Sequence, residues 1–341
     1  MYILGINFSH HGSICLLKDG EVVLFLEEER LSHIKYGFIK DESCNVLSKI
    51  KQYTNKLDYI VFAWPIASPQ EYTGIFPLKD FNRILKALIK HPKYPEYNLD
   101  NNLNILSKLL EVSDSETKFS VVQASHHELH AAQAFYASGF TDAICVVVDG
   151  QGSSYSIENT DIWEKESIWE YSYNNNKQLH CNYNIEETGI GNMYSQITRE
   201  LGFNGGFEEG KTMGLSSYKP HYMEDPTMMV NVSKANVVQK QSQEAVLKII
   251  LHGLTLSKSK NVCISGGYGL NCVANYYYRK NLPPDINLYC EPVANDAGQS
   301  IGVAKFMYHK LTNDTKIKPQ TSICLGPTPR YCNDTLAQPI P

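Results

Sequence analysis

Three histidines stand close together in the segment SVVQASHHELHAAQAFYASGF, residues 120–140. His126 and His130 are four residues apart, and residues at this spacing share one face of a helix, with Cβ atoms about 5–6 Å apart. Both imidazoles could then bind one metal ion, whereas His127 is rotated by about 100° and points elsewhere. The alternative is a structural role, in which Ser125 caps the helix and Glu128 completes a capping box. The spacing alone leaves both interpretations open.

Two aspartates, Asp149 and Asp296, stand in glycine-containing segments, VVVDGQG and ANDAG. Each ends a predicted strand or opens a turn, where a carboxylate can bind a metal ion or orient the metal of a bound nucleotide. The alternative, and commoner, role is to stabilise the local turn or to cap a helix. Both aspartates are therefore candidate metal ligands whose structural role stays open.

Three glycine-containing turns follow predicted strands, at residues 12–13, 149–153 and 265–269. Glycine lets backbone N–H groups approach an anion closely, and a helix N-terminus adds the positive end of its dipole. The segment GGYGLN matches neither the G-x-G-x-x-G fingerprint nor a P-loop, so neither a Rossmann nor a Walker site is predicted. One such turn is usually only a turn, but three in one chain favour nucleotide binding.

Two further segments carry groups that could act on a bound ligand. Lys211 lies between glycines in GFEEGKTMGLSSY, residues 206–218, and could reach a phosphate as a point charge or remain a solvated loop lysine. His10 and His11 occupy the first turn of the chain, where loops often carry function. With an ordinary pKa near 6.5, an exposed histidine can act as a general base toward a hydroxyl group.

The elements that must position these residues alternate between strands and helices. Apolar runs predict strands at 2–7, 12–17, 21–30, 59–65, 142–148, 154–157, 261–265 and 287–290. Apolar residues at helical spacing predict helices at 81–91, 102–112, 242–254 and after residues 271 and 296. This order predicts an α/β fold with mixed sheets.

The segments 2–17 and 142–157 follow the same plan, with an apolar strand, a polar turn containing glycine and a returning strand. We interpret this similarity as an internal duplication, with its boundary near residues 120–140.

The bulk composition limits the classes of protein to be considered. The 341 residues, 43% of them hydrophobic and 20% charged, can form a sizeable core, and the formal charge of −5 gives no footprint for nucleic acid. The longest apolar runs are strand-sized, and the N-terminus lacks the basic start of a signal peptide. The nine cysteines include no C-x-x-C pair, which indicates a reducing compartment. We expect a cytoplasmic protein without a membrane segment.

Seven segments between the first residues and about residue 305 are compared together, in this order: ILGINFSHHGSICLLKDGEVVLFLEEERLSHIKYGF, HHELHAAQAFYASGF, VVVDGQG, GNMYSQITRELGF, EEGKTMGLSSY, SGGYGLNCVAN and NDAGQSIGVA. Together they resemble the O-carbamoyltransferase family that includes nodulation-factor and antibiotic carbamoyltransferases. The resemblance implies the actin/sugar-kinase-like (ASKHA) fold of two related lobes, with mixed sheets flanked by helices. We therefore expect a first lobe at 1–125, a second lobe with the metal and nucleotide site at 126–320, and a linker-like tail at 321–341.

The resemblance also implies roles for single residues. The implied metal ligands are His126, His130, Asp149 and Asp296, for an Fe²⁺-like ion or for Mg²⁺ or Mn²⁺. His11 takes the position of the family's catalytic histidine, and Lys35 that of a basic residue near the donor. The candidate nucleotide contacts are Gly150, Lys211, Gly266, Gly267 and Asn271. The implied donor is carbamoyl-adenylate, made with ATP, and AMP is the leaving group.

The chain departs from the family pattern in three ways. The basic run after EEER is thinned, with His33, Ile34 and Tyr36 where basic residues or histidine are common. Gly12 follows His11, where the family usually has aspartate after its histidine. The family's second domain, which makes carbamoyl-adenylate from carbamoyl phosphate and ATP, would begin near ICLGPTPRY, where this sequence stops. We therefore expect the transfer half alone, with a separate donor-forming protein as a possible partner.

Other functions stay open at this stage. They are threonylcarbamoyl transfer to tRNA, a sugar kinase on the same fold, and a non-catalytic remnant that only binds nucleotide and metal. The sequence identifies neither the hydroxyl acceptor, which is a small molecule, a sugar or a nucleotide, nor whether two chains form a homodimer.

Overall fold

A computed structural model gives the three-dimensional structure of the chain. It describes residues 1–8, 10–39, 45–63, 74–80, 109–122, 124–157, 160–183 and 188–326. The helix predicted at 81–91, most of the one at 102–112 and the tail from residue 327 lie outside the described residues.

The first sheet has six strands in the order β3-β2-β1-β4-β6-β5. They are β1 (Tyr2–Asn7), β2 (Ser13–Lys18), β3 (Glu21–Glu27), β4 (Tyr59–Ala63), β5 (Gly74–Pro77) and β6 (Lys118–Val121). Strands β1, β2 and β3 form an antiparallel meander, whereas β1, β4 and β6 run parallel, and β5 adds an antiparallel strand beside β6.

The second sheet has five strands in the order β11-β10-β7-β12-β13. They are β7 (Asp142–Val148), β10 (Glu166–Ser172), β11 (Asn175–Cys181), β12 (Asn261–Ser265) and β13 (Asn287–Cys290). Their order and directions repeat those of β3-β2-β1-β4-β6, because β7 is antiparallel to β10 and parallel to β12. The two lobes are therefore related, as the similar segments in the sequence predict.

One detail of the predicted duplication is wrong. The strand that returns beside β7 is β10, not residues 154–157. Those residues form β8 (Ser154–Ile157), which pairs with β9 (Thr160–Trp163) in a separate two-stranded sheet. The second lobe thus inserts a small hairpin between the two strands that correspond to β1 and β2.

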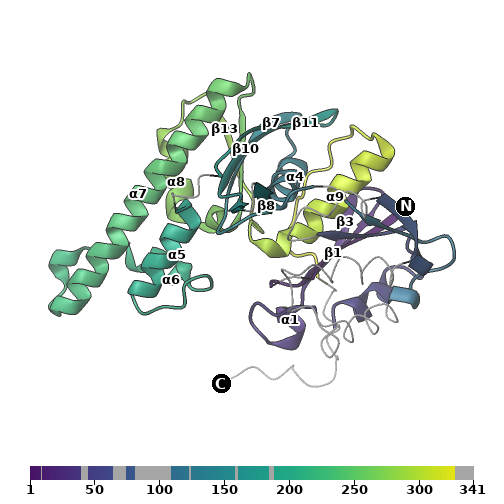
Figure 1. Cartoon of the computed structure of the whole chain (residues 1–341), viewed down its shortest axis with the longest axis horizontal. Helices are drawn as coiled ribbons and strands as arrows, with labels where there is room; N and C mark the ends of the chain where they lie inside the picture. The colour runs from purple at the N-terminus through teal and green to yellow at the C-terminus, as the bar shows by residue number, and fades with distance from the viewer. Residues whose placement is uncertain are drawn as a thin grey trace, which may run out of the picture.

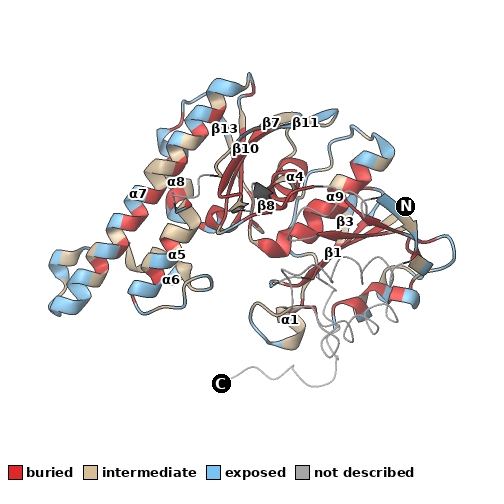
Figure 2. Cartoon of the chain, viewed as in Figure 1, coloured by how far each residue is buried: buried red, intermediate tan, exposed pale blue. Residues whose placement is uncertain are grey.

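Helices cover both faces of the second sheet. One face packs against α5 (Ile190–Glu200), α7 (Pro226–Leu256) and α8 (Cys272–Asn281), and α6 (Glu209–Leu215) lies beside α5 and α7 (Figure 1). The sequence predicts only residues 242–254 of α7, but the helix begins at Pro226, with the Asp225 side chain accepting a hydrogen bond from the Thr227 N–H. The added first part buries Val232, Ala235 and Val238 at helical spacing. Most of its other residues are exposed (Figure 2), and the apolar ones among them, such as Met229 and Val237, obscure the stripe.

Two helices, α4 (His126–Ser138) and α9 (Gln299–Thr312), cross between the lobes. Helix α4 follows the first sheet but packs on the second, and α9 follows the second sheet but packs on β1, β2 and β4 of the first. The two helices also pack against each other in the middle of the molecule (Figure 1). At their contact, a Cβ on Gly302 would lie 2.3 Å from the Leu129 carbonyl oxygen. This exchange brings the start of each helix to the cleft between the lobes. The lobe boundary at residue 125 stays a prediction.

Short helical segments complete the described elements. They are α1 (Glu29–Ser32), η2 (Leu47–Gln52), η4 (Leu78–Asp80), η6 (Pro220–Tyr222), η7 (Gly267–Leu270) and η8 (Asp296–Gly298). Within the described part of the chain, no helix combines the length and apolar character needed to cross a membrane.

Candidate metal centre and substrate cavity

The histidine segment folds as a capped helix, and its two spaced histidines also meet. The Ser125 hydroxyl accepts a hydrogen bond from the Glu128 N–H, and α4 begins at His126. The Nε2 atoms of His126 and His130 lie 3.2 Å apart, whereas the Nδ1 atom of His127 points away and lies 2.9 Å from the Ser167 hydroxyl. The helix is therefore capped by Ser125 as one interpretation predicts, and it also places His126 and His130 on one face as the other predicts.

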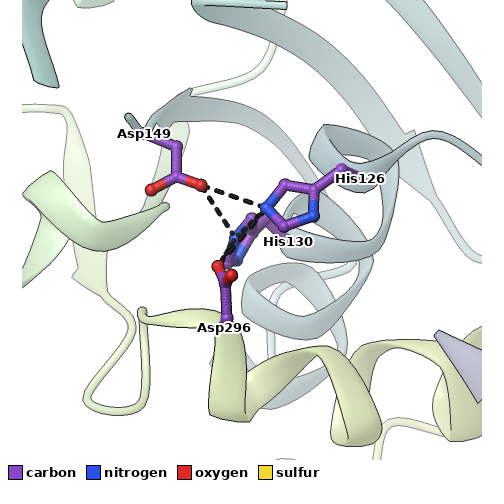
Figure 3. A group of neighbouring side chains, drawn as sticks. All are labelled: His126, His130, Asp149 and Asp296. Carbon is purple, nitrogen blue, oxygen red and sulfur yellow. Dashed lines mark hydrogen bonds and ion pairs between the residues drawn. The ribbon is translucent and has the colours of Figure 1, made fainter. Parts of the chain in front are cut away.

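Two aspartates from distant parts of the chain complete this group (Figure 3). Asp149 follows β7 and Asp296 opens η8, directly before α9. The His126 Nε2 atom lies 3.0 Å from an Asp149 oxygen and 3.3 Å from an Asp296 oxygen. The corresponding distances from His130 Nε2 are 3.6 and 3.4 Å.

This group fits a divalent metal ion by its donor set. Two imidazole nitrogens and two carboxylate oxygens lie within 4.8 Å of one another. His130 is 0% exposed, and the other three side chains are also buried or nearly so. A buried set of imidazole and carboxylate ligands suits iron, manganese or zinc. We call these four residues the His/Asp cluster.

The side chains of the cluster balance one another's charge. Burial alone would lower the pKa of His126, but the charges and hydrogen bonds of Asp296 and Asp149 outweigh it and hold this pKa well above its usual value. Burial would raise the pKa of Asp149, yet hydrogen bonds from His126 and His130 hold it far below its usual range. The cluster thus holds protonated histidines against two carboxylates. When the histidines lose their protons, a divalent cation can take the place of that positive charge.

The predicted nucleotide turn at 265–269 lies directly beside the cluster. The Gly267 N–H donates a hydrogen bond of 2.9 Å to the second oxygen of Asp149. Gly266 has a φ of +86°, and a Cβ there would lie 2.3 Å from the Val148 carbonyl oxygen, so only glycine lets the turn approach β7 this closely.

A cavity of about 780 Å³ opens onto the cluster. Nine of the eleven predicted site residues line it: His11, Lys35, His126, Asp149, Gly150, Lys211, Gly267, Asn271 and Asp296. His130 and Gly266 do not, because His130 is fully buried and Gly266 packs on β7. The structure therefore brings the predicted residues of both lobes to one cavity.

Three of these lining residues already have partners in the protein. Lys211 lies in α6 rather than in a loop, and its Nζ atom is 2.6 Å from a Glu208 oxygen. The Asn271 side chain caps α8 by accepting a hydrogen bond from the Ala274 N–H. Lys35 is exposed, with its Nζ atom 4.7 Å from the centre of the Tyr36 ring.

His10 is a cavity residue to which the sequence analysis assigns no separate role. Its Nε2 atom lies 2.9 Å from the Asp296 oxygen that faces away from the cluster, and this hydrogen bond raises the pKa of His10. Its neighbour His11 has a φ of +58° and places its ring 4.6 Å from that of Tyr36. Burial lowers the pKa of His11, and its Nδ1 atom forms no hydrogen bond with any described residue. Because His10 and His11 are adjacent in the sequence, the sequence alone could not show which of the two rings contacts Asp296.

The arrangement of the two lobes defines a protein of the actin/sugar-kinase fold class, as predicted. The same fold appears in the crystal structure of full-length HypF in its phosphate- and nucleotide-bound form. The similarity has a TM-score of 0.53 at 12% identity and covers 92% of this chain and 56% of that one.

Within this fold class, the chain belongs to the family described as the carbamoyltransferase N-terminus, whose model matches residues 2–223 and 234–305. It is 25% identical to the nodulation protein NolNO of Sinorhizobium fredii, over 94% of this chain and 49% of that protein. It is also 27% identical to the uncharacterized protein sll1178 of Synechocystis, over 98% of this chain and 62% of that protein. The chain thus spans about half to three fifths of the length of these relatives.

Proposed function

We propose that this chain transfers a carbamoyl group from carbamoyl-adenylate to a hydroxyl group of a small-molecule, sugar or nucleotide acceptor. The observation that carries the proposal is that one cavity joins the His/Asp cluster to the two histidines of the first turn. Its volume of about 780 Å³ is in the range of sites that hold a nucleotide or a drug-sized ligand. Family membership supports the reaction type.

In the proposed reaction, the acceptor oxygen attacks the carbamoyl carbon and forms the new C–O bond. The C–O bond to the adenylate phosphate breaks, and AMP leaves with the bonding electrons. A divalent cation held by the His/Asp cluster would neutralise and orient the phosphate of the donor. The protein must also remove the proton of the acceptor hydroxyl as the oxygen attacks.

A histidine of the first turn is suited to take this proton. His10 and His11 both line the cavity, and a histidine near neutrality is an effective general base. The lowered pKa of His11 keeps its ring neutral and able to accept a proton. His10 stands closer to the cluster, because it contacts Asp296. The assignment of the general base to His11 therefore remains a prediction, and His10 is the alternative candidate.

The other lining residues would bind and orient the two substrates. The glycine-containing turns that hold Gly150 and Gly267 stand beside Asp149, where their backbone can approach the donor. Lys35 and Lys211 add positive charge to the lining of the cavity.

The test compares metal content and nucleotide binding in the wild type and in His126→Ala/His130→Ala. Elemental analysis and calorimetric titration with AMP should show near-stoichiometric metal and nucleotide binding in the wild type. The double variant should lose the metal and bind AMP more weakly. A matched control is His180→Ala/His252→Ala, a second histidine pair with ring centres 5.7 Å apart, whose members are exposed and do not line the cavity.

Transfer itself is measured as AMP release from supplied carbamoyl-adenylate, with a panel of sugars, aminoglycosides and nucleosides as acceptors. Acceptor-dependent AMP release in the wild type and in the control, but not in His126→Ala/His130→Ala, is the expected result. If the wild type and the double variant carry no metal and bind AMP equally, the histidine pair is structural. The chain would then be better described as a non-catalytic remnant.

A further inference from the structure

A buried acidic segment lies directly behind the turn that carries Asp149. Glu164 and Lys165 connect β9 to β10, which begins at Glu166, and Glu164 is 0% exposed. A buried carboxylate is costly unless hydrogen bonds satisfy it, so its partners show what it holds in place. None of the predicted site residues belongs to this segment.

The side chain of Glu164 joins two pieces of backbone that carry cluster residues. Its Oε2 atom accepts a hydrogen bond of 2.9 Å from the Ser153 N–H, at the end of the Asp149 turn. The same oxygen lies 3.4 Å from the His127 nitrogen, in the first turn of α4. A single carboxylate oxygen thus touches both the turn of Asp149 and the helix of His126.

The backbone of Glu164 holds the same turn from its other side. Its carbonyl oxygen accepts a hydrogen bond of 2.8 Å from the Gly152 N–H, and its own N–H donates one of 3.0 Å to the Ser153 carbonyl. A Cβ on Gly152 would lie 2.6 Å from both the Glu164 Oε2 atom and the His127 ring. The turn is therefore seated between Glu164 and α4 with no room for a side chain.

Ser153 provides a second connection between the turn and the helix. Its hydroxyl oxygen accepts a hydrogen bond of 2.9 Å from the His126 N–H. Ser153 is fully buried, as is His127 behind it. The relative position of Asp149 and His126 is thus fixed through Ser153 and Glu164 rather than by the two side chains alone.

We infer that Glu164 is a positioning residue that sets the distance between Asp149 and His126 and so prepares the cluster for a divalent cation. Groups that orient metal ligands typically change metal affinity by about 10- to 100-fold when they are removed. The inference rests on the proposed metal-binding role of the cluster. It adds that the hairpin inserted between β7 and β10 ends in a residue that supports the site.

The test replaces Glu164 in two ways and titrates each protein with Mn²⁺ or Co²⁺. Glu164→Met keeps the length of the side chain but removes both acceptors, and the dissociation constant for Mn²⁺ should rise by about 10- to 100-fold. Glu164→Gln keeps one acceptor oxygen for the two N–H groups and should stay within a few fold of the wild type. The Co²⁺ absorption bands should shift in Glu164→Met, because the ligands no longer meet at the same distances.

Two further variants separate positioning from folding. Ser153→Ala removes only the link to His126 and should weaken Mn²⁺ binding about fivefold, so it tests the inference even if Glu164→Met does not fold. Glu170→Met is the control, because Glu170 lies on β10, close to Glu164 in the sequence, but accepts a hydrogen bond from the Ser257 hydroxyl after α7 and does not line the cavity. It should leave the Mn²⁺ affinity within about threefold of the wild type.

The outcomes distinguish the inference from the proposed function. If the wild type binds neither ion, the metal-binding role fails, and the inference falls with it. If the wild type binds Mn²⁺, and folded Glu164→Met and Ser153→Ala bind it equally well with unchanged Co²⁺ bands, only the positioning role of Glu164 is overturned.

Discussion

At the scale of single residues, the first turn of the chain places two histidines in different surroundings. His10 contacts Asp296 and has a raised pKa, whereas His11 packs against Tyr36 and has a lowered pKa. Only one ring can be the group that accepts the proton of the attacking hydroxyl. The other then acts through its contacts, on Asp296 in the case of His10 or on Tyr36 in the case of His11.

Substitution by glutamine separates these two roles. The variant that removes the general base should lower kcat for carbamoyl transfer by about 10²- to 10⁴-fold, whereas the other variant should keep most of the rate. His10→Gln should weaken metal binding in either case, since one Asp296 oxygen loses the His10 ring as its partner. Single-turnover rates and elemental analysis of both variants are the measurements. Retention of the full rate by both would contradict a histidine base.

The four residues of the His/Asp cluster could be named as candidates from the sequence, because each leaves a local mark there. The four-residue spacing of His126 and His130 and a glycine within two residues of Asp149 and Asp296 are these marks, and the metal-binding role stays a proposal. Glu164 leaves no such mark, since its role depends on contacts with Ser153 and His127 that exist only after β9 and β10 have formed. Contacts between distant segments cannot be read from spacing.

At the scale of elements, a contact between Tyr36 and Phe207 joins the two lobes along the wall of the cavity. Tyr36 follows α1 in the first lobe, and its hydroxyl donates a hydrogen bond to the Phe207 carbonyl, in the connection between α5 and α6 of the second lobe. The two rings are 4.8 Å apart. Both residues line the cavity, so this contact ties the two lobes together beside the proposed ligand site.

Removal of this bridge should speed the escape of bound nucleotide. Tyr36→Ala loses both the ring contact and the hydrogen bond, and the dissociation rate of AMP should rise by about fivefold to tenfold. Tyr36→Phe keeps the ring and should show a smaller increase. Stopped-flow displacement of a fluorescent AMP analogue measures both rates. Equal rates in all three proteins would show that the bridge does not retain the nucleotide.

A buried lysine on α9 gives a prediction about pH. Lys305 is 2% exposed, and its Nζ atom donates to the Gly20 and Lys318 carbonyls. Burial lowers its pKa to about 8 from an ordinary 10.5. Between these two values the unfolded chain binds more protons than the folded one, so folding is favoured as the pH rises through this window.

The comparison protein is Lys305→Met, which lacks this group. The free energy of unfolding of the wild type should rise relative to that of Lys305→Met by up to about 3 kcal/mol between pH 7.5 and 10.5. Urea titrations at several pH values measure this difference, in which groups common to both proteins cancel. A difference that does not change with pH would show that Lys305 titrates normally.

The elements were predictable where an apolar run ends in a turn, as in β1, β2, β7 and β12. The prediction failed for the partner of β7, because residues 154–157 are also strand-like and come first in the sequence. It also missed the start of α7, although Asp225 before Pro226 is a helix-start signal, because exposed apolar residues such as Met229 and Val237 stand among the buried ones and obscure the helical period.

At the scale of the whole molecule, the exchange of α4 and α9 joins the two lobes into one structure. Each helix belongs by sequence to one sheet and by packing to the other, and both begin at the cluster. Three of the four cluster residues therefore stand in the first turns of this helix pair or directly before them, namely His126, His130 and Asp296. We expect the two lobes to unfold together rather than one after the other.

Gly302 tests this expectation, because it lies where α9 touches α4. Gly302→Ala places a methyl group against the Leu129 carbonyl oxygen, which forces the helices apart, and should destabilise the protein by about 1–3 kcal/mol. Gly210→Ala is the control, since a Cβ there meets nothing within 4 Å. Calorimetry should show one transition in both proteins, at a lower Tm only in Gly302→Ala. Two separate transitions would contradict joint unfolding.

The late position of α9 in the chain also matters while the ribosome is making the protein. The face of the first sheet that carries Ile3, Cys15 and Leu17 is covered by Ile301 and Ala304 of α9. At about 5–20 residues per second, roughly 15–60 s pass between the synthesis of that sheet's first strand and of its cover. During this time an apolar surface stays open on the nascent chain, which makes the newly begun first lobe a natural client for a ribosome-associated chaperone.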